Sequence, residues 1–365
     1  MEFRLQPARP QYGLKRELPT KDHEILCASM EFGCQAAVRP SRLKPELHTC
    51  HRSFTCSLSR LKPELRTGLR SEPMLKTIVL LFTLLLAAES HWVLDLGGRI
   101  ERDSAGAIAG VILRGTWVTD SDLEALRQMK EIARLDLALT RITDQGLLRL
   151  RDLRHIADLD LSYAEQITDE GASAVKDWHL IRLDLRGTKI TDTTLSMLSR
   201  MATLKALDIG FAQVTDSGLQ FLSALTGLEE LALGGNKLTE RGLQVLYSMP
   251  RLRRLDVSGK QRTDSGLWSV SVTDLALDPL ASLKELRELN LNGAQVSARG
   301  LEKLAGLANL DKLHLYGAKP VRDDAIAVLS SLPRLRWVDL KDTSVTAEGV
   351  EKLRAAKPQC VILWQ

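Results

Sequence analysis

A pattern of about 24 residues repeats along the chain, and it constrains the fold more than any other feature of the sequence. In the copy at 204–227, leucine and isoleucine alternate at period two, Thr215-Asp216 interrupts the alternation, and leucines then recur at period three. Period two is typical of a strand and period three of a helical segment. The pattern LxxLxLxxTxITDxGLxxLxxLxx begins at Ile132, Ile156, Leu180, Leu204, Leu228, Leu252, Leu286, Leu310 and Leu335, with a degenerate copy at Ile108.

No single copy can bury its own leucines, so the copies must stack and share one continuous core. With about six apolar side chains buried per copy, at roughly 1.5–3 kcal/mol each, the stack offsets the entropy lost in ordering its backbone. The sequence therefore predicts an α/β solenoid, or horseshoe, over residues 108–365, with one strand and one helical segment per copy.

The repeats have a distinctive variant of this pattern. The position that many leucine-rich repeats fill with asparagine is threonine at Thr116, Thr140, Thr188 and Thr343, and Thr-Asp-x-Gly-Leu follows in several copies. This variant resembles the repeats of secreted bacterial leucine-rich-repeat proteins and, in the repeats only, those of F-box leucine-rich-repeat substrate receptors. The resemblance covers about 107–365 and implies a parallel sheet on the concave face, helices on the convex face, and protein binding. It implies no active site.

The Thr-Asp and glycine positions predict how each strand gives way to its helix. The threonine hydroxyl can cap the first turn while the acid faces the helix dipole, at Thr119, Thr143, Thr168, Thr191, Thr215, Thr239 and Thr263. Glycine follows at a fixed offset, where it permits close packing of neighbouring turns, at Gly146, Gly171, Gly218, Gly242, Gly266 and Gly300.

The first ninety residues do not follow the repeat. Residues 1–73 have scattered proline and arginine and hold four of the five cysteines in no zinc-binding pattern, so we predict a disordered or spurious extension. At Met74 an apolar run begins that is too short to span a bilayer and ends in small residues. We predict a signal peptide at 74–90 and a mature chain from near His91; the alternative is a short buried helix behind a genuine N-terminal region.

Charge and cysteine content exclude several classes of function for the mature chain. Residues 1–73 hold 13 Lys/Arg against 8 Asp/Glu, which leaves 37 against 38 for the remainder, so no basic stripe is available for nucleic acid. After residue 90 the only cysteine is Cys360, which rules out a disulfide framework. We expect no cofactor, no metal and no membrane span, and the oligomeric state stays open.

Two segments depart from the regular repeat. Residues 91–107 are predicted to be an N-terminal cap, since a turn at 104–106 would fold one strand back onto the first strand of the solenoid. The copy at Leu252 is ten residues longer and puts Arg262 where others have an aliphatic residue, and we place the insertion at about 268–279. We expect Arg262 to reach Asp274 or Asp278, or else to snorkel at the convex rim; Asp278-Pro279 is expected to begin a helix.

The sequence offers no catalytic constellation. It lacks HExxH, GxSxG and a phosphate-binding glycine loop, and the histidines of the mature chain lie in different copies. We therefore predict a non-enzymatic protein.

The strand positions that face away from the core supply the first candidate site. One column of these positions reads Asp136, Asp160, Asp184, Asp208, Ala232, Asp256, Asn290, His314, Asp339, with adjacent strands about 4.8 Å apart. Consecutive carboxylates at that spacing repel one another unless they are neutralised. Either flanking basic residues satisfy them, at Arg134, Arg182, Arg186, Arg254 and Lys312, or they attract a basic patch on a partner.

Large side chains at the position after the strand supply the second candidate site. Most copies have glycine there, but Leu139, Tyr163 and Phe211 are large, with Gly187 predicted as a notch between the two aromatics. His314, Tyr316 and Trp337 form a second predicted cluster near the other end of the face. Exposed aromatics around a gap are typical of binding hot spots. The alternative is that these side chains lie flat over neighbouring backbone.

Three classes of function follow. The first is a secreted or periplasmic scaffold that binds a protein or peptide on its concave face. The second is an intracellular substrate receptor of a ubiquitin ligase, of F-box-like type, although no helical apolar pattern spans residues 33–73. The third is a structural envelope protein without a specific ligand.

Overall fold

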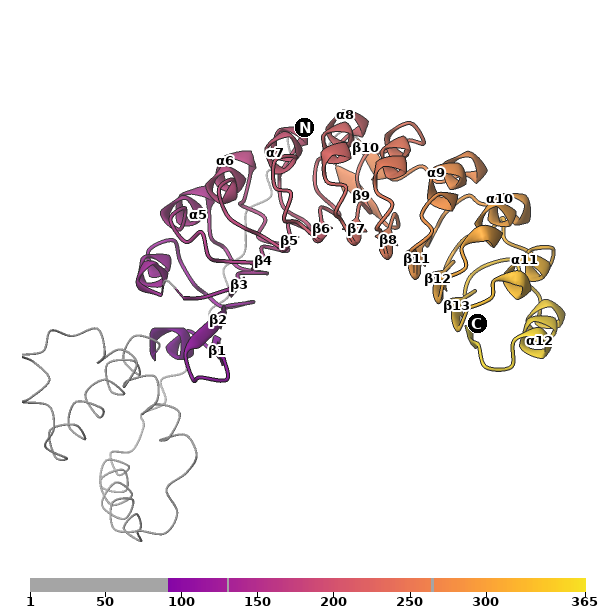
Figure 1. Ribbon diagram of the computed structural model, residues 1–365, viewed down its shortest axis with the longest axis horizontal. Coiled ribbons are helices and arrows are strands. Elements are labelled where there is room, and N and C mark those ends of the chain that lie inside the picture. Colours follow the sequence, from indigo (N-terminus) through magenta and orange to yellow (C-terminus); the bar gives the residue numbers. More distant parts are fainter. Residues whose placement is uncertain (1–90, 130, 264–265) are drawn as a thin grey trace, which may run out of the picture. The chain divides into compact units, whose positions relative to one another are not determined.

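The computed structural model of the protein describes residues 91–365 except 130, 264 and 265, and at Arg262 it describes the backbone alone. The predicted extension at 1–73 and the predicted signal peptide at 74–90 lie outside the described residues. Within the described part, the α/β leucine-rich-repeat solenoid predicted from the sequence is confirmed. Its strands line the inner side of a curve and its helical segments line the outer side (Figure 1).

One twelve-stranded sheet runs through the solenoid in sequence order. All neighbouring strands are parallel except the first pair, which is antiparallel. The strands are β1 (Arg99–Arg102), β2 (Ile108–Ile112), β3 (Arg134–Asp136), β4 (Asp158–Asp160), β5 (Arg182–Asp184), β6 (Ala206–Asp208), β7 (Glu230–Ala232), β8 (Arg254–Asp256), β11 (Glu288–Asn290), β12 (Lys312–His314), β13 (Trp337–Asp339) and β14 (Val361–Leu363).

The outer layer consists of short α-helices and 3-10 helices (η). They are η2 (Asp122–Gln128), α5 (Asp144–Arg149), α6 (Asp169–Ala172), η3 (Ser173–Val175), α7 (Asp192–Leu198), α8 (Asp216–Leu219), η4 (Gln220–Ala224), η5 (Gly242–Ser248), η6 (Asp274–Ala276), α9 (Leu277–Ala281), α10 (Ala298–Glu302), η7 (Lys303–Gly306), α11 (Ala325–Ser331) and α12 (Ala347–Ala356). Between the two layers the repeat leucines form one continuous core.

The N-terminal end of the sheet is a hairpin. Strand β1 pairs antiparallel with β2, and β2 then pairs parallel with β3. A hydrogen bond from the backbone N–H of Gly106 to the carbonyl of Asp103 closes the turn between β1 and β2. This is the arrangement that the sequence predicts for the cap segment and the first strand of the solenoid.

The Thr-Asp-x-Gly motif forms a ladder that joins most repeats to the next. Thr168 donates its backbone N–H and its hydroxyl to the Asp144 carboxylate of the preceding repeat, at 2.8 and 2.6 Å. The same hydroxyl accepts from the N–H of Glu170, which is the cap that the sequence predicts. A Cβ at Gly171 would lie 2.3 Å from Asp144 Oδ1, so glycine is required where the carboxylate of the neighbouring repeat passes.

The insertion lies earlier than the sequence analysis placed it. It forms an antiparallel hairpin of β9 (Lys260–Thr263) and β10 (Gly266–Ser269), whereas the sequence predicts it at about 268–279. The repeat has resumed by Thr273, which caps η6 and donates to Glu240 of the preceding repeat. Thr263 instead donates its hydroxyl to the Gly266 carbonyl within the hairpin, so neither it nor Gly266 takes the predicted place in the ladder.

The expected helix start at Asp278 is also corrected. Asp278 lies inside α9, which begins at Leu277 after Ala276, because the repeat has already entered its helical segment at Asp274. Its carboxylate pairs with Lys303 Nζ at 2.8 Å. The side chain of Arg262 lies outside the described part of the chain, so its predicted contacts stay predictions.

Candidate functional site

The concave sheet brings the predicted acidic column into register. Asp136, Asp160, Asp184 and Asp208 are direct partners on neighbouring parallel strands. Ala232 interrupts the run after Asp208, and the column continues through Asp256, Asn290, His314 and Asp339. The structure therefore assembles the predicted column in full.

Each acid of the column also has a local backbone role. Oδ1 of Asp184 accepts the backbone N–H of Arg186 at 2.9 Å, and Oδ1 of Asp208 accepts that of Gly210 at 2.7 Å. Asn290 makes the same contact with the N–H of Asn292. An amide oxygen can accept this hydrogen bond as well as a carboxylate can. The contact therefore explains why the position has a short side chain with an acceptor oxygen, but it does not explain why that side chain is charged.

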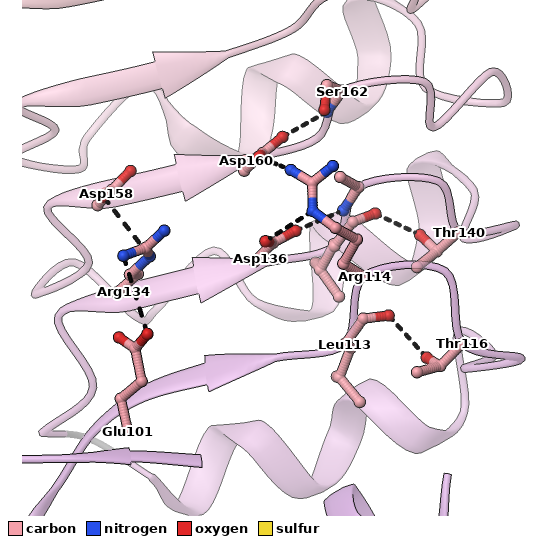
Figure 2. A network of polar contacts seen from close by, with 12 residues as sticks. Glu101, Leu113, Arg114, Thr116, Arg134, Asp136, Thr140, Asp158, Asp160 and Ser162 are labelled. Atoms are coloured by element: carbon pink, nitrogen blue, oxygen red, sulfur yellow. Dashed lines mark hydrogen bonds and ion pairs between the residues drawn. The ribbon is translucent and has the colours of Figure 1, made fainter. Parts of the chain in front are cut away.

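Arg114 pairs with both carboxylates at the N-terminal end of the column (Figure 2). Its Nε lies 3.1 Å from Asp136 Oδ2, and its Nη2 donates to Asp160. Arg134 lies between Glu101 and Asp158, at 3.9 and 3.7 Å, in the adjacent column. Arg114 belongs to the degenerate first copy, where the repeat pattern does not single it out.

Most of the arginines and lysines expected to neutralise the central column pair elsewhere. Arg182 and Arg254 both pair with Glu230, and Lys312 pairs with Glu288 at 3.7 Å. Arg254 and Glu230 are register partners on adjacent strands. The nearest carboxylate to the Arg254 guanidinium therefore lies in the same column of strand positions and not in the acidic column. Of the five predicted neutralising residues, Arg186 alone reaches the central column, at 3.5 Å from Asp208.

Asp184 is left without an ion pair among the described residues. Burial, and then repulsion from Asp208, raise the pKa of its carboxyl from 3.8 to about 7. Burial also raises the pKa of Asp208. The middle of the column therefore holds carboxylates that would gain from a cation.

A groove of about 340 Å³ lies over this part of the sheet. Seven carboxylates and three arginines line it, together with His314 and with the small side chains of Ala206 and Ala232. The carboxylates belong to Asp158, Asp160, Asp184, Asp208, Glu230, Asp256 and Glu288, and the arginines are Arg134, Arg182 and Arg254. The groove is thus net acidic.

The large side chains after the strands stand on a strained backbone. Leu139, Tyr163 and Phe211 have φ of 56°, 58° and 56°, in the left-handed region that costs a residue with a Cβ roughly 1–2 kcal/mol. Glycine occupies this conformation in most other copies, for example at Gly187 and Gly235. Strain of this kind is often found at functional sites.

Arg186 joins the two aromatics of this row. Its Nε donates to the Tyr163 hydroxyl at 3.1 Å, and its guanidinium carbon lies 4.6 Å from the centroid of the Phe211 ring. We call Tyr163, Arg186 and Phe211 the aromatic ridge. Tyr163 is 41% exposed, while Phe211 is half-buried. Leu139 is 54% exposed and lies one copy before the ridge.

The predicted notch at Gly187 is not open. A Cβ there would lie 2.6 Å from Tyr163 Cδ1, so the tyrosine ring covers the glycine. Phe211 likewise covers Gly235 and reaches Gly259, at 2.8 and 2.7 Å from where their Cβ atoms would be. The rings lie over these backbones because only glycine leaves room beside them.

The second predicted cluster is brought together in part. The rings of His314 and Trp337 lie with centroids 4.4 Å apart, and His314 Nε2 lies 3.1 Å from Glu288 Oε1. Tyr316 is half exposed two residues beyond His314, and no ring contact joins it to another described aromatic.

Two further findings bear on the site. Within 91–365, apart from the gaps already given, no group of three or more His, Cys, Asp or Glu side chains could hold a metal ion. In the same described part, no helix has both the length and the apolar character needed to cross a bilayer.

A family model described as leucine-rich repeat matches residues 152–176, 200–223 and 284–305. The chain carries leucine-rich repeats. No curated protein sequence matches it. Among solved structures, it is similar to an internalin from Listeria monocytogenes, with 14% identity over 76% of this chain and 94% of that one and a TM-score of 0.47. It is also similar to an internalin C2 from the same species, with 23% identity over 71% of this chain and 81% of that one and a TM-score of 0.32.

Proposed function

We propose that the chain is a non-enzymatic scaffold that binds a protein or an extended peptide on its concave face. The observation that carries the proposal is the acidic groove over the sheet, lined by seven carboxylates and three arginines. A basic side chain of the partner would lie beside Asp184, which has no ion pair within the described chain, and complementary charge of this kind raises specificity and association rate.

Aromatic anchors would flank the groove. Tyr163 and Phe211 follow β4 and β6, whereas Tyr316 follows β12 and Trp337 begins β13. Leu139, Asp160, Asp208 and His314 complete the proposed contact surface. Exposed tyrosine and tryptophan commonly supply most of the free energy of binding in such interfaces. Arg186 fixes the ridge before binding through its contacts with both aromatics, so little side-chain entropy would be lost on docking.

The test is affinity capture with the full chain, followed by measured affinities of variants for the captured partner. Tyr163→Ala with Phe211→Ala should weaken binding by about 2 kcal/mol or more. A matched control is Phe221→Ala with Tyr247→Ala, since both are exposed aromatics on the outer segments η4 and η5. Equal loss in the control pair, or unchanged affinity in the ridge pair, would move the site off this face.

We also propose that the scaffold is secreted or periplasmic, on the strength of the signal-like run after Met74. Expression from Met74 should give an exported protein whose N-terminal residue, found by sequencing, lies near His91. A chain that stays in the cytoplasm and captures a ubiquitin-ligase adaptor would favour the intracellular receptor instead. A chain that shows no saturable partner would favour the structural envelope protein.

A further inference from the structure

The inserted hairpin and the aromatic ridge lie on the same edge of the solenoid. We call this the exit edge: the loops that leave strands β5 to β8, at 186–190, 210–214, 234–238 and 258–259, together with strands β9 and β10. Gln261 of β9 donates its side-chain amide to the Ala212 carbonyl at 2.7 Å. The Phe211 ring reaches Gly259, directly before β9. Figure 1 shows β9 and β10 between the inner strands and the outer helical layer.

The exit edge presents apolar surface. Leu267, on β10, is 63% exposed and is among the most exposed large apolar side chains of the described chain. Beside it, the Trp268 ring lies 6.0 Å from Lys237 Nζ. Tyr163 lies just beyond the other end of the edge, in the loop after β4, where its hydroxyl accepts from Arg186. An insertion that interrupts a regular repeat commonly lies on a binding face.

The charge of the exit edge is opposite to that of the groove. Every charged residue of its four loops is a cation, namely Arg186, Lys189 and Lys237, and Lys260 at the start of β9 adds another. The three lysines are exposed, and no carboxylate of the described residues lies within ion-pair distance of them. Strands two apart are about 10 Å from each other, so Lys189 and Lys237 form a spaced row of positive charge.

We propose that the exit edge is a second docking surface, distinct from the groove, and that it takes an acidic segment of a partner protein. Carboxylates of the segment would meet Lys189, Lys237 and Lys260, and an apolar side chain would pack on Leu267. A nucleic acid fits less well. Arg186 already covers a face of Phe211, which removes a stacking platform, and the adjacent acidic groove repels a continuous polyanion.

Fluorescence anisotropy with three labelled probes tests the assignment on the full chain. The probes are a twelve-residue peptide of alternating glutamate and leucine, the same peptide with lysine for glutamate, and a single-stranded twelve-nucleotide DNA. The acidic peptide should bind saturably. Lys189→Glu, Lys237→Glu and Lys260→Glu together should weaken it by about tenfold or more, and Leu267→Asp should weaken it too.

Two controls make the outcome decisive. Lys176→Glu, Lys284→Glu and Lys352→Glu change the net charge equally away from the exit edge and should leave binding within about twofold, since exposed charges at a distance are screened. Asp184→Asn with Asp208→Asn should not weaken the acidic peptide, although it should weaken a partner that occupies the groove. No binding of the acidic peptide, equal loss in the control triple, or tighter binding of the DNA would overturn the proposal.

Discussion

Arg186 stacks on Phe211 with its guanidinium carbon 4.6 Å from the ring centroid. The same side chain donates to the Tyr163 hydroxyl and pairs with Asp208. One residue therefore links the two aromatics of the ridge to the acidic column of the sheet. Because Tyr163 and Phe211 keep a left-handed backbone that glycine adopts elsewhere, the chain holds this linked arrangement at a cost in stability.

That cost can be measured at Leu139, which has the same backbone strain and is more exposed. Leu139→Gly should be more stable than Leu139→Ala by about 1 kcal/mol, because both remove the exposed side chain but only glycine relieves a φ of 56°. Denaturant titration of the two variants gives the difference. An alanine variant as stable as the glycine variant would mean that the turn is not strained.

The Thr-Asp-x-Gly ladder gives a second prediction. Gly218→Ala should destabilise the chain by about 1–3 kcal/mol, because the new Cβ would lie 2.2 Å from Asp192 Oδ1 and 3.0 Å from its Cα. Gly306→Ala is the matched control, since only the flexible end of Lys284 approaches that position. Thermal unfolding of both should show a loss for Gly218→Ala and no loss for Gly306→Ala.

The two faces of β6 give a third prediction. Leu207→Ala should cost about 2–5 kcal/mol, because Leu207 is buried in the core. Asp208→Ala should change stability by less than about 1 kcal/mol, since relief of repulsion within the column offsets the lost hydrogen bond from the Gly210 N–H and the lost ion pair with Arg186. Similar losses at both positions in a denaturant titration would contradict the assigned strand faces.

The sequence predicts these strand faces well for a physical reason. A 24-residue period joined to period-two alternation leaves one register for each strand, and Leu207 and Asp208 must then face opposite sides. The insertion was harder to place because Thr263-Asp264 and Thr273-Asp274 fit the motif equally well in one dimension. Only the contact between Thr273 and Glu240 of the preceding repeat decides between them.

The ion pairs could not be predicted from the sequence. Arginine side chains reach across one or two strands, so Arg182 and Arg254 each have several carboxylates within range. Both pair with Glu230, which lies in the same column of strand positions as the two arginines. The pattern of charges along one strand does not predict which carboxylate each arginine pairs with. For the same reason the sequence does not predict that Asp184 lacks an ion pair, because this follows from the pairing of the neighbouring arginines with other carboxylates.

Asp184 gives the last prediction, a pH dependence of stability. Its carboxyl has a pKa of about 7 in the folded chain against an ordinary value of 3.8, with burial as the main cause and repulsion from Asp208 next. A folded-state pKa above the unfolded value favours the protonated folded form. Its contribution to stability is therefore full below about pH 4 and is lost as the pH rises through about 7.

Asp184→Asn should remove this dependence, because an amide oxygen can still accept the Arg186 N–H, as Asn290 does from Asn292. The variant should match the parent chain near pH 4 and exceed its free energy of unfolding by about 1–3 kcal/mol at pH 8. Asp339→Asn is the control: it has the same type of backbone contact, to Lys341, but its neighbour in the column is His314 and not a carboxylate. Equal changes of stability in both variants across this pH range in urea titrations, or no change in Asp184→Asn, would mean that Asp184 is not the carboxyl whose pKa is raised on folding.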